Sequence, residues 1–245
     1  MANWSDPRMT AGPAGATVGI RDAAYDAGLR SYMLSVYNYM ASAVLLTGIV
    51  AMAFAWGKET SMAAQVMSTP LRWVIMLAPL GFVFALSFGI NKMSTATAQA
   101  VFWAFAVVMG LSMSSIFLVY TETSIAQAFF ATAAAFAGLS LYGYTTKRDL
   151  SGFGSFLIMG VVGLIVAMLL NLWLKSTVMG YAISAIGVLI FAGLTAYDTQ
   201  RIKSMYAYVA GTDMVGKTVI MGALSLYLDF INMFQFLLSF MGNRN

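Results

Sequence analysis

The sequence contains no cysteine and no histidine, and charged residues make up only 9% of its 245 residues. The lack of cysteine excludes disulfides and thiol catalysis. A zinc protease needs histidine or cysteine ligands and a rhomboid-type serine protease needs a histidine, so both classes are excluded. Soluble domains carry about 25% charged residues, and the low charged fraction therefore excludes an ordinary soluble domain.

Hydrophobic residues account for 60% of the chain. They gather in runs of about 20 residues, the length at which a helix crosses a bilayer. We therefore predict an all-α integral membrane protein of seven transmembrane helices in a lipid bilayer. The predicted spans cover residues 33–56, 73–93, 100–120, 124–144, 154–174, 178–200 and 218–241. A retinal protein is excluded because neither of the last two spans has the interior lysine that its Schiff base requires.

The charged residues outside the spans predict the orientation. Residues 1–30 mix charged side chains with glycine, alanine and proline and lack the apolar core of a signal peptide. We predict a flexible cytoplasmic N-terminal tail over 1–30 and one transmembrane domain over 31–245. Most of the 13 lysine and arginine residues fall in this tail and in the loops on its side, so the positive-inside rule places the C-terminus outside, unless the last run is re-entrant. The net charge is +4, but the positive residues form no basic stripe, so we expect no nucleic-acid partner.

Two acidic residues fall inside the predicted spans. Asp229 lies near the middle of the seventh span, and Asp198 lies toward the inner end of the sixth. An ionisable group in the hydrocarbon is costly and marks a functional site by default. Arg201, Asn232 and Gln235 are possible supporting polar residues. The alternatives are structural: Asp198 could end its helix and pair with Arg201, Asp229 could bond to backbone or hydroxyl groups, and the two amides could simply join helices.

Two aspartates on adjacent spans also fit an intramembrane aspartyl protease, whose carboxyls share one proton. Tyr197 and Asp198 resemble the first half of the presenilin-type signature. The second half should be Gly-x-Gly-Asp, whereas this chain has Leu-Tyr-Leu-Asp over 226–229. The protease therefore stays a secondary hypothesis.

Two motifs carry a resemblance to a known family. They are GLTAYDTQRI at 193–202 and ALSLYLDFIN at 223–232, supported by YNYM at 37–40 and LYGYTTKRDL at 141–150. The sequence is similar to the Bax inhibitor-1 (transmembrane Bax inhibitor motif) family of the bacterial kind, over nearly the whole chain after about residue 28. The pairing of the two motifs in successive spans is what makes the resemblance specific.

The resemblance implies a fold in which the last helix is central and wrapped by the other six. It also implies a multi-pass protein of the bacterial inner (plasma) membrane that acts as a pH-sensitive calcium leak channel, with Asp198 and Asp229 as sensor and gate. We therefore expect no enzymatic activity and no tightly bound cofactor, with calcium as the permeant ion. In bacterial relatives an arginine on the second helix latches the aspartates. Here the second span has Arg72 and Lys92 only near its ends, so the latch is not transferred.

Physical chemistry is compatible with this implied function. Calcium prefers oxygen ligands, and Asp198 and Asp229 could bind it transiently. Neighbouring carboxyls titrate as a coupled pair, and we expect these two within one hydrogen bond or one bridging water in a closed form. The predicted span ends leave Asp229 about 10 Å deeper than Asp198, so helix six must continue past Arg201 or helix seven must begin earlier. The alternative function is a modulator of another membrane protein, such as a membrane-bound ATP-dependent protease.

Overall fold

The fold is described here from a computed structural model, which covers residues 14–244, with side chains from residue 23 onward. Residues 1–13 and 245 lie outside the described part. Helices account for all the long elements in this part. They are, in chain order, α1 (Ala14–Phe54), the 3-10 helix η1 (Lys58–Thr60), α2 (Met62–Met67), α3 (Leu71–Gly89), α4 (Thr95–Met113), α5 (Ser115–Val119), α6 (Glu122–Thr145), α7 (Ser151–Leu174), α8 (Thr177–Val209) and α9 (Val215–Met241).

Seven of these segments are long and apolar enough to cross a membrane, which confirms the predicted fold class and all seven spans. Side-chain caps mark where several of them begin. The hydroxyl groups of Ser94, Thr121 and Ser176 each accept a hydrogen bond from a backbone N–H in the first turn of α4, α6 and α8. Such caps satisfy backbone donors that a helix leaves unpaired at its N-terminus.

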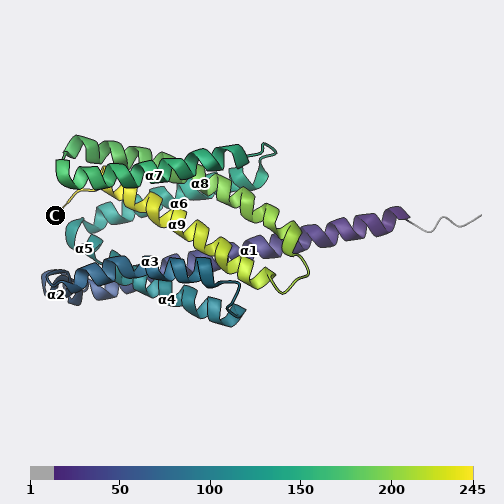
Figure 1. Cartoon of the computed structure of the whole chain (residues 1–245), viewed down its shortest axis with the longest axis horizontal. Helices are drawn as coiled ribbons and strands as arrows, with labels where there is room; N and C mark the ends of the chain where they lie inside the picture. Colours follow the sequence, from purple (N-terminus) through teal and green to yellow (C-terminus); the bar gives the residue numbers. More distant parts are fainter. Residues whose placement is uncertain (1–13, 245) are drawn as a thin grey trace, which may run out of the picture.

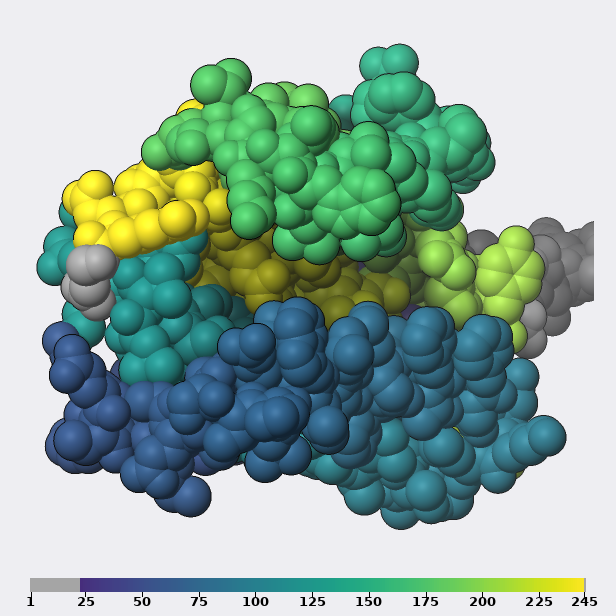
Figure 2. All heavy atoms as spheres, turned by 60° about the vertical axis from the view of Figure 1, so that its left-hand side comes forward, coloured from purple at the N-terminus to yellow at the C-terminus, as the bar shows by residue number. Residues whose placement is uncertain are grey.

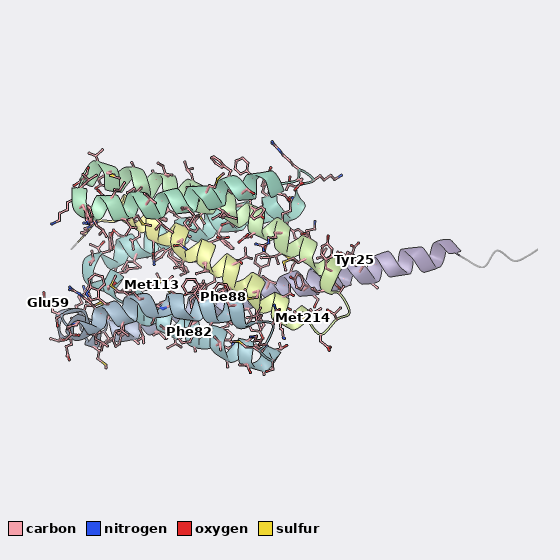
Figure 3. The ribbon with its side chains drawn as sticks, in the orientation of Figure 1. Tyr25, Glu59, Phe82, Phe88, Met113 and Met214 are labelled. Carbon is pink, nitrogen blue, oxygen red and sulfur yellow. The ribbon has the colours of Figure 1, made fainter. Side chains whose placement is uncertain are left out.

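The spans alternate in direction between two ends of the bundle (Figure 1). The start of α1 and the α3–α4, α6–α7 and α8–α9 turns lie at one end, whereas α2, α5 and the C-terminus lie at the other. Figure 3 shows the same separation, with Tyr25 and Met214 far from Glu59. The C-terminal segment is fixed at its end because Thr121 N–H donates to the Asn243 carbonyl at 3.1 Å. The last helix therefore crosses the whole bundle and does not turn back.

The last helix, α9, is the most buried span, with 67% of its apolar stretch inside the protein. It runs between the α7–α8 pair and the α3–α4 pair (Figure 2). The prediction that all six other spans wrap it is not confirmed. Helices α1, α4, α6 and α8 pack on α9, whereas α3 packs mainly on α4, and α7 packs mainly on α8. A cavity lies between α7 and α9, which accounts for the missing contact.

Helices α1 and α8 are longer than the bilayer requires. At 1.5 Å per residue α8 is about 50 Å long, against about 30 Å of hydrocarbon. At the end where both exceed it, Tyr206 of α8 packs against Tyr25 and Tyr32 of α1, with ring centroids 5.2 and 5.3 Å apart. We call these three residues the tyrosine cluster. A Cβ on Gly28 would collide with the Tyr206 hydroxyl group, so a larger residue there would displace the Tyr206 side chain.

The domain boundary expected at residue 30 has no counterpart in the helix. Residues 14–30 belong to the expected flexible tail, but here they form the beginning of α1. A helix continues as long as its backbone hydrogen bonds can form, whether or not it has left the hydrocarbon. Residues 14–30 contain no proline that would interrupt these bonds. The rest of the predicted tail, residues 1–13, lies outside the described residues, and its cytoplasmic location stays a prediction.

Candidate functional site

A cavity of about 350 Å³ lies between α7, α8 and α9. Both predicted site carboxyls, Asp198 from α8 and Asp229 from α9, line it, together with Ser225 and Asn232. The remaining lining is apolar and comes from Val161, Leu164, Ile165, Met168, Phe191, Leu194, Leu228 and Phe236. We call this space the aspartate cavity. It brings together two acidic residues that have 30 residues between them in sequence and lie on two helices joined by the α8–α9 turn.

The ends of α8 and α9 explain why the two acids meet. Helix α8 continues to Val209 and α9 begins at Val215, whereas the sequence predicted 200 and 218. Asp198 is therefore about 16 Å, and Asp229 about 21 Å, from the turn that joins the helices, at 1.5 Å per residue. The expected 10 Å difference in depth falls to about 5 Å. The sequence required one of two adjustments, a longer helix six or an earlier start of helix seven, and the structure has both.

Close packing fixes α8 around Asp198. A Cβ on Gly143 of α6 would collide with the backbone carbonyl of Ala196, and one on Gly154 of α7 would collide with the Tyr197 ring. Neither helix could approach α8 so closely with a larger residue. The residues directly before Asp198 are thus held from two sides, which leaves its carboxyl to face the aspartate cavity.

Hydrogen bonds hold the segment that follows Asp198. Tyr37 of α1 bonds to Ser140 of α6 at 3.0 Å, and Ser140 bonds to the fully buried Thr199 at 2.9 Å. The next residue, Gln200, accepts from Leu150 N–H and donates to the Arg148 carbonyl. The motif that follows the aspartate therefore joins α8 to α1, α6 and the α6–α7 turn.

Asp229 is buried, with 4% of its surface exposed, and its Oδ2 atom has no hydrogen-bond partner among the described residues. The proposed bonds to backbone or hydroxyl groups therefore do not satisfy that oxygen. Asp198 lines the same cavity. No hydrogen bond joins the two carboxyls in the described part, and a bridging water stays a prediction. An unpaired buried oxygen costs about 1–3 kcal/mol, so a packing role alone does not explain it.

The three residues predicted to support the aspartates lie in different surroundings. Asn232 lines the aspartate cavity, and its amide donates to the Leu228 carbonyl at 2.8 Å, which leaves its oxygen available. Gln235 is exposed on α9 and lies outside the cavity lining. Arg201 is exposed, and it forms no ion pair with Asp198 among the described residues. Helix α8 does not end at Asp198 either, so the interfacial alternative for this residue is not supported by the structure.

Sequence reasoning missed Ser225 and the hydroxyl chain of Tyr37, Ser140 and Thr199. Ser225 is one turn before Asp229, and this spacing could have indicated that the two share a face. The hydroxyl chain joins residues 103 and 59 positions apart, and no local pattern predicts such contacts. Arg72 lies in the first turn of α3, the second span, where its guanidinium group stacks on the Trp73 ring at 5.3 Å. It is therefore away from the aspartates.

Comparison with known proteins gives one consistent family. The model of the family "Inhibitor of apoptosis-promoting Bax1" matches residues 29–245. The protein RP147 of Rickettsia prowazekii is 48% identical over 234 residues, which cover 93% of this chain and 96% of that protein. The inner membrane protein YbhL of Escherichia coli (strain K12) is 46% identical over 223 residues, or 89% of this chain and 94% of YbhL.

A more distant relative extends the same picture. A Streptococcus pyogenes protein, named as an uncharacterized membrane protein, is 35% identical over 221 residues, which cover 90% of this chain and 96% of that protein. Both family motifs lie within the matched range, and both supply residues to the aspartate cavity. The chain is thus a multi-pass membrane protein that belongs to the family of inhibitors of apoptosis-promoting Bax1, the Bax inhibitor-1 family.

Proposed function

We propose that this protein is a pH-sensitive calcium leak channel in which Asp198 and Asp229 form the gate. The observation that carries the proposal is the aspartate cavity, where two carboxyls from adjacent spans face one space within the membrane. Acids are rare in membrane spans, and those that occur there mark ion paths and proton relays. The absence of histidine from the sequence leaves these carboxyls as the groups best suited to sense pH.

Protonation changes the force between the two carboxyls. When both are ionised their charges repel, and α8 and α9 are pushed apart at the aspartate cavity. When one is protonated it can donate a hydrogen bond to the other, which holds the helices together. Acid therefore closes the path, and alkali opens it. The unpaired Oδ2 atom of Asp229 is the acceptor available for this bond.

The cavity offers ligands that suit calcium in passage. Asp198, Asp229, Asn232 and Ser225 supply oxygen atoms, whereas resident calcium takes six to eight of them. No group of three or more His, Cys, Asp and Glu side chains that could hold a metal ion occurs among residues 23–244, whose side chains the structure describes. A site with so few donors favours transient binding, which a leak requires. We accordingly propose transport without a tightly bound cofactor and without enzymatic activity.

The orientation is part of the proposal. The end of the bundle with the start of α1 also holds the turn that contains Arg148 and the part of α8 that follows Asp198 (Figure 1). Lys203 lies in that part, where its ammonium group donates to the Tyr144 carbonyl at 2.8 Å. Positive residues concentrate on the cytoplasmic side of membrane proteins. We therefore propose a cytoplasmic N-terminus.

The test is calcium flux into liposomes that hold purified protein and a calcium-sensitive dye. Wild type is compared with Asp198→Asn and Asp229→Asn, matched for the amount reconstituted, across about pH 6 to 8. Asparagine keeps the size of aspartate but does not titrate in this range. Both variants should lose most of the pH dependence of the flux. The control is Asp213→Asn in the exposed α8–α9 turn, which should keep the wild-type profile.

Two results would contradict the proposal. An unchanged pH profile in both cavity variants would remove these residues as the sensor. No flux through wild type would exclude the leak and favour the role of a membrane partner that modulates another protein, such as an ATP-dependent protease. Cleavage of a transmembrane peptide that is lost in both variants would favour the aspartyl protease instead.

A further inference from the structure

A second and larger cavity, of about 650 Å³, lies on the opposite face of α9 from the aspartates. On α9 it is lined by Phe230, Ile231 and Phe234. Because successive residues of a helix are turned by about 100°, these three side chains lie on the side of α9 away from Asp229. Helices α1 and α6 form its two long walls, and Met113, Ile116 and Phe117 line it between them. The groove is partly open, because Leu45 and Met52 of α1 and Phe130 of α6 line it and are exposed. We call this space the α1–α6 groove.

The groove has the depth of one lipid leaflet. On α1 its lining runs from Val44 to Ala55, which is about 17 Å at 1.5 Å per residue, and half of a bilayer's hydrocarbon is about 15 Å. It begins at the end of the bundle that Glu59 marks and reaches inward past Met113 (Figure 3). Exposed tryptophans occur at the same end, Trp56 before η1 and Trp73 at the start of α3, as is usual at a membrane interface.

The groove suits a hydrocarbon chain. A hydrocarbon chain has no side chains and is flexible enough to fill such a space. The lining is almost wholly apolar, and water would gain few hydrogen bonds there. An apolar space left empty would also lose dispersion contacts along its whole length.

The mouth of the groove carries one charge of each sign. Lys58 and Glu122 line it and form an ion pair at 3.5 Å, with side chains that are 67% and 74% exposed. An exposed pair is weak and can exchange its partners readily. The lysine can bind a phosphate and the glutamate can accept hydrogen bonds from a primary ammonium group. A quaternary ammonium has no N–H to donate, and a headgroup with only negative charge leaves the glutamate without a partner.

We propose that the α1–α6 groove binds one phospholipid with a primary amine, phosphatidylethanolamine, with an acyl chain along α1 and α6 and its headgroup between Lys58 and Glu122. This binding is independent of calcium passage on the opposite face of α9. The lipid belongs to the leaflet at the end of the bundle that holds the C-terminus. It fills a space that neither the protein nor water fills favourably.

Native mass spectrometry of the purified full chain in mild detergent tests the occupant. The protein is titrated with phosphatidylethanolamine, phosphatidylcholine and phosphatidylglycerol of identical acyl chains, and bound lipid is counted after release from the micelle. We expect the first to bind about tenfold more tightly than the other two, the effect of one hydrogen bond to a charged group. Equal binding of all three, or a preference for phosphatidylglycerol, would overturn the proposal.

Two pairs of variants test the place of binding. Gly48 lines the groove and a Cβ there meets nothing within 4 Å, so Gly48→Leu should occupy the groove. Gly163→Leu on α7, where a Cβ also meets nothing within 4 Å, is the matched control outside it. Lys58→Gln removes the phosphate ligand, and Lys175→Gln is its control, since both lysines have φ near 50°. We expect Gly48→Leu to abolish specific binding and Lys58→Gln to lower affinity about tenfold.

The controls should bind as wild type does. Thermal melting of each variant shows whether it folds, and the Lys58→Gln pair changes only exposed side chains, so this comparison stays valid if a leucine variant melts early. Full binding by both Gly48→Leu and Lys58→Gln would place the lipid elsewhere and would refute the site.

Discussion

Replacement of Asp229 by leucine should stabilise this protein while it removes the proposed gate. The Asp229 carboxyl is buried and its Oδ2 atom has no hydrogen-bond partner in the described structure. The side chain also borders the aspartate cavity of about 350 Å³, so a leucine has room without displacing its neighbours. A residue selected for stability alone would be apolar at this position.

The expected gain follows from the unpaired oxygen. A buried polar atom without a partner costs about 1–3 kcal/mol, and Asp229→Leu should recover an amount in this range. For chains of 150–250 residues each kcal/mol shifts the melting temperature by about 2–4 °C, so the predicted rise is about 2–12 °C. Asp229→Asn keeps a polar group at the site and should gain less than leucine does.

Thermal unfolding in mild detergent, followed by circular dichroism, measures this shift. The control is Asp213→Leu, because Asp213 is exposed and its replacement should change the free energy of unfolding by no more than about 0.5 kcal/mol. An Asp229→Leu protein that melts at or below the wild-type temperature would refute the reasoning. It would mean that the oxygen is well satisfied in the folded state and that the aspartate contributes to stability.

Three further predictions test the packing and the orientation. Gly143→Leu should lower the free energy of unfolding by more than about 3 kcal/mol, because its side chain collides with the α8 backbone, whereas Gly138→Leu on the same helix meets nothing and should melt as wild type does. Tyr227→Phe should cost about 1 kcal/mol in the same assay, since it removes the 2.7 Å bond to Thr47. A single Arg148→Cys should resist an impermeant thiol reagent in intact cells while Lys175→Cys reacts, and the opposite pattern would invert the topology.

The seven spans followed from the sequence because hydrocarbon requires long apolar runs, whatever the tertiary structure. The ends of the spans did not, because nothing in the apolar pattern stops a helix at the membrane surface. Helix α8 has no glycine or proline between Asp198 and Val209, and it continues to Val209. The predicted span end at residue 200 thus marks the end of the apolar run and not the end of the helix.

The candidate site was predictable in its residues but not in its geometry. Asp198 and Asp229 could be selected because acids inside spans are rare. Their shared depth depends on where α8 ends and α9 begins, which span lengths alone do not give. Arg201 and Gln235 were selected because they lie near the acids in sequence, yet the first is exposed and the second lies outside the aspartate cavity. Whether a residue faces the aspartate cavity depends on the direction of its side chain around the helix and not only on its distance in sequence from the acids.

The length of α8 has a mechanical consequence. Asp198 and Tyr206 belong to the same unbroken helix and are eight residues apart, or about two turns. A tilt of α8 at the tyrosine cluster would therefore also move Asp198, the proposed gate residue, because a rigid helix transmits a tilt along its length. A force on the beginning of α1 would reach α8 through the contacts of Tyr25 and Tyr32 with Tyr206. A fluorophore or spin label placed beside Tyr206 would report movement within the aspartate cavity while the cavity itself stays unaltered.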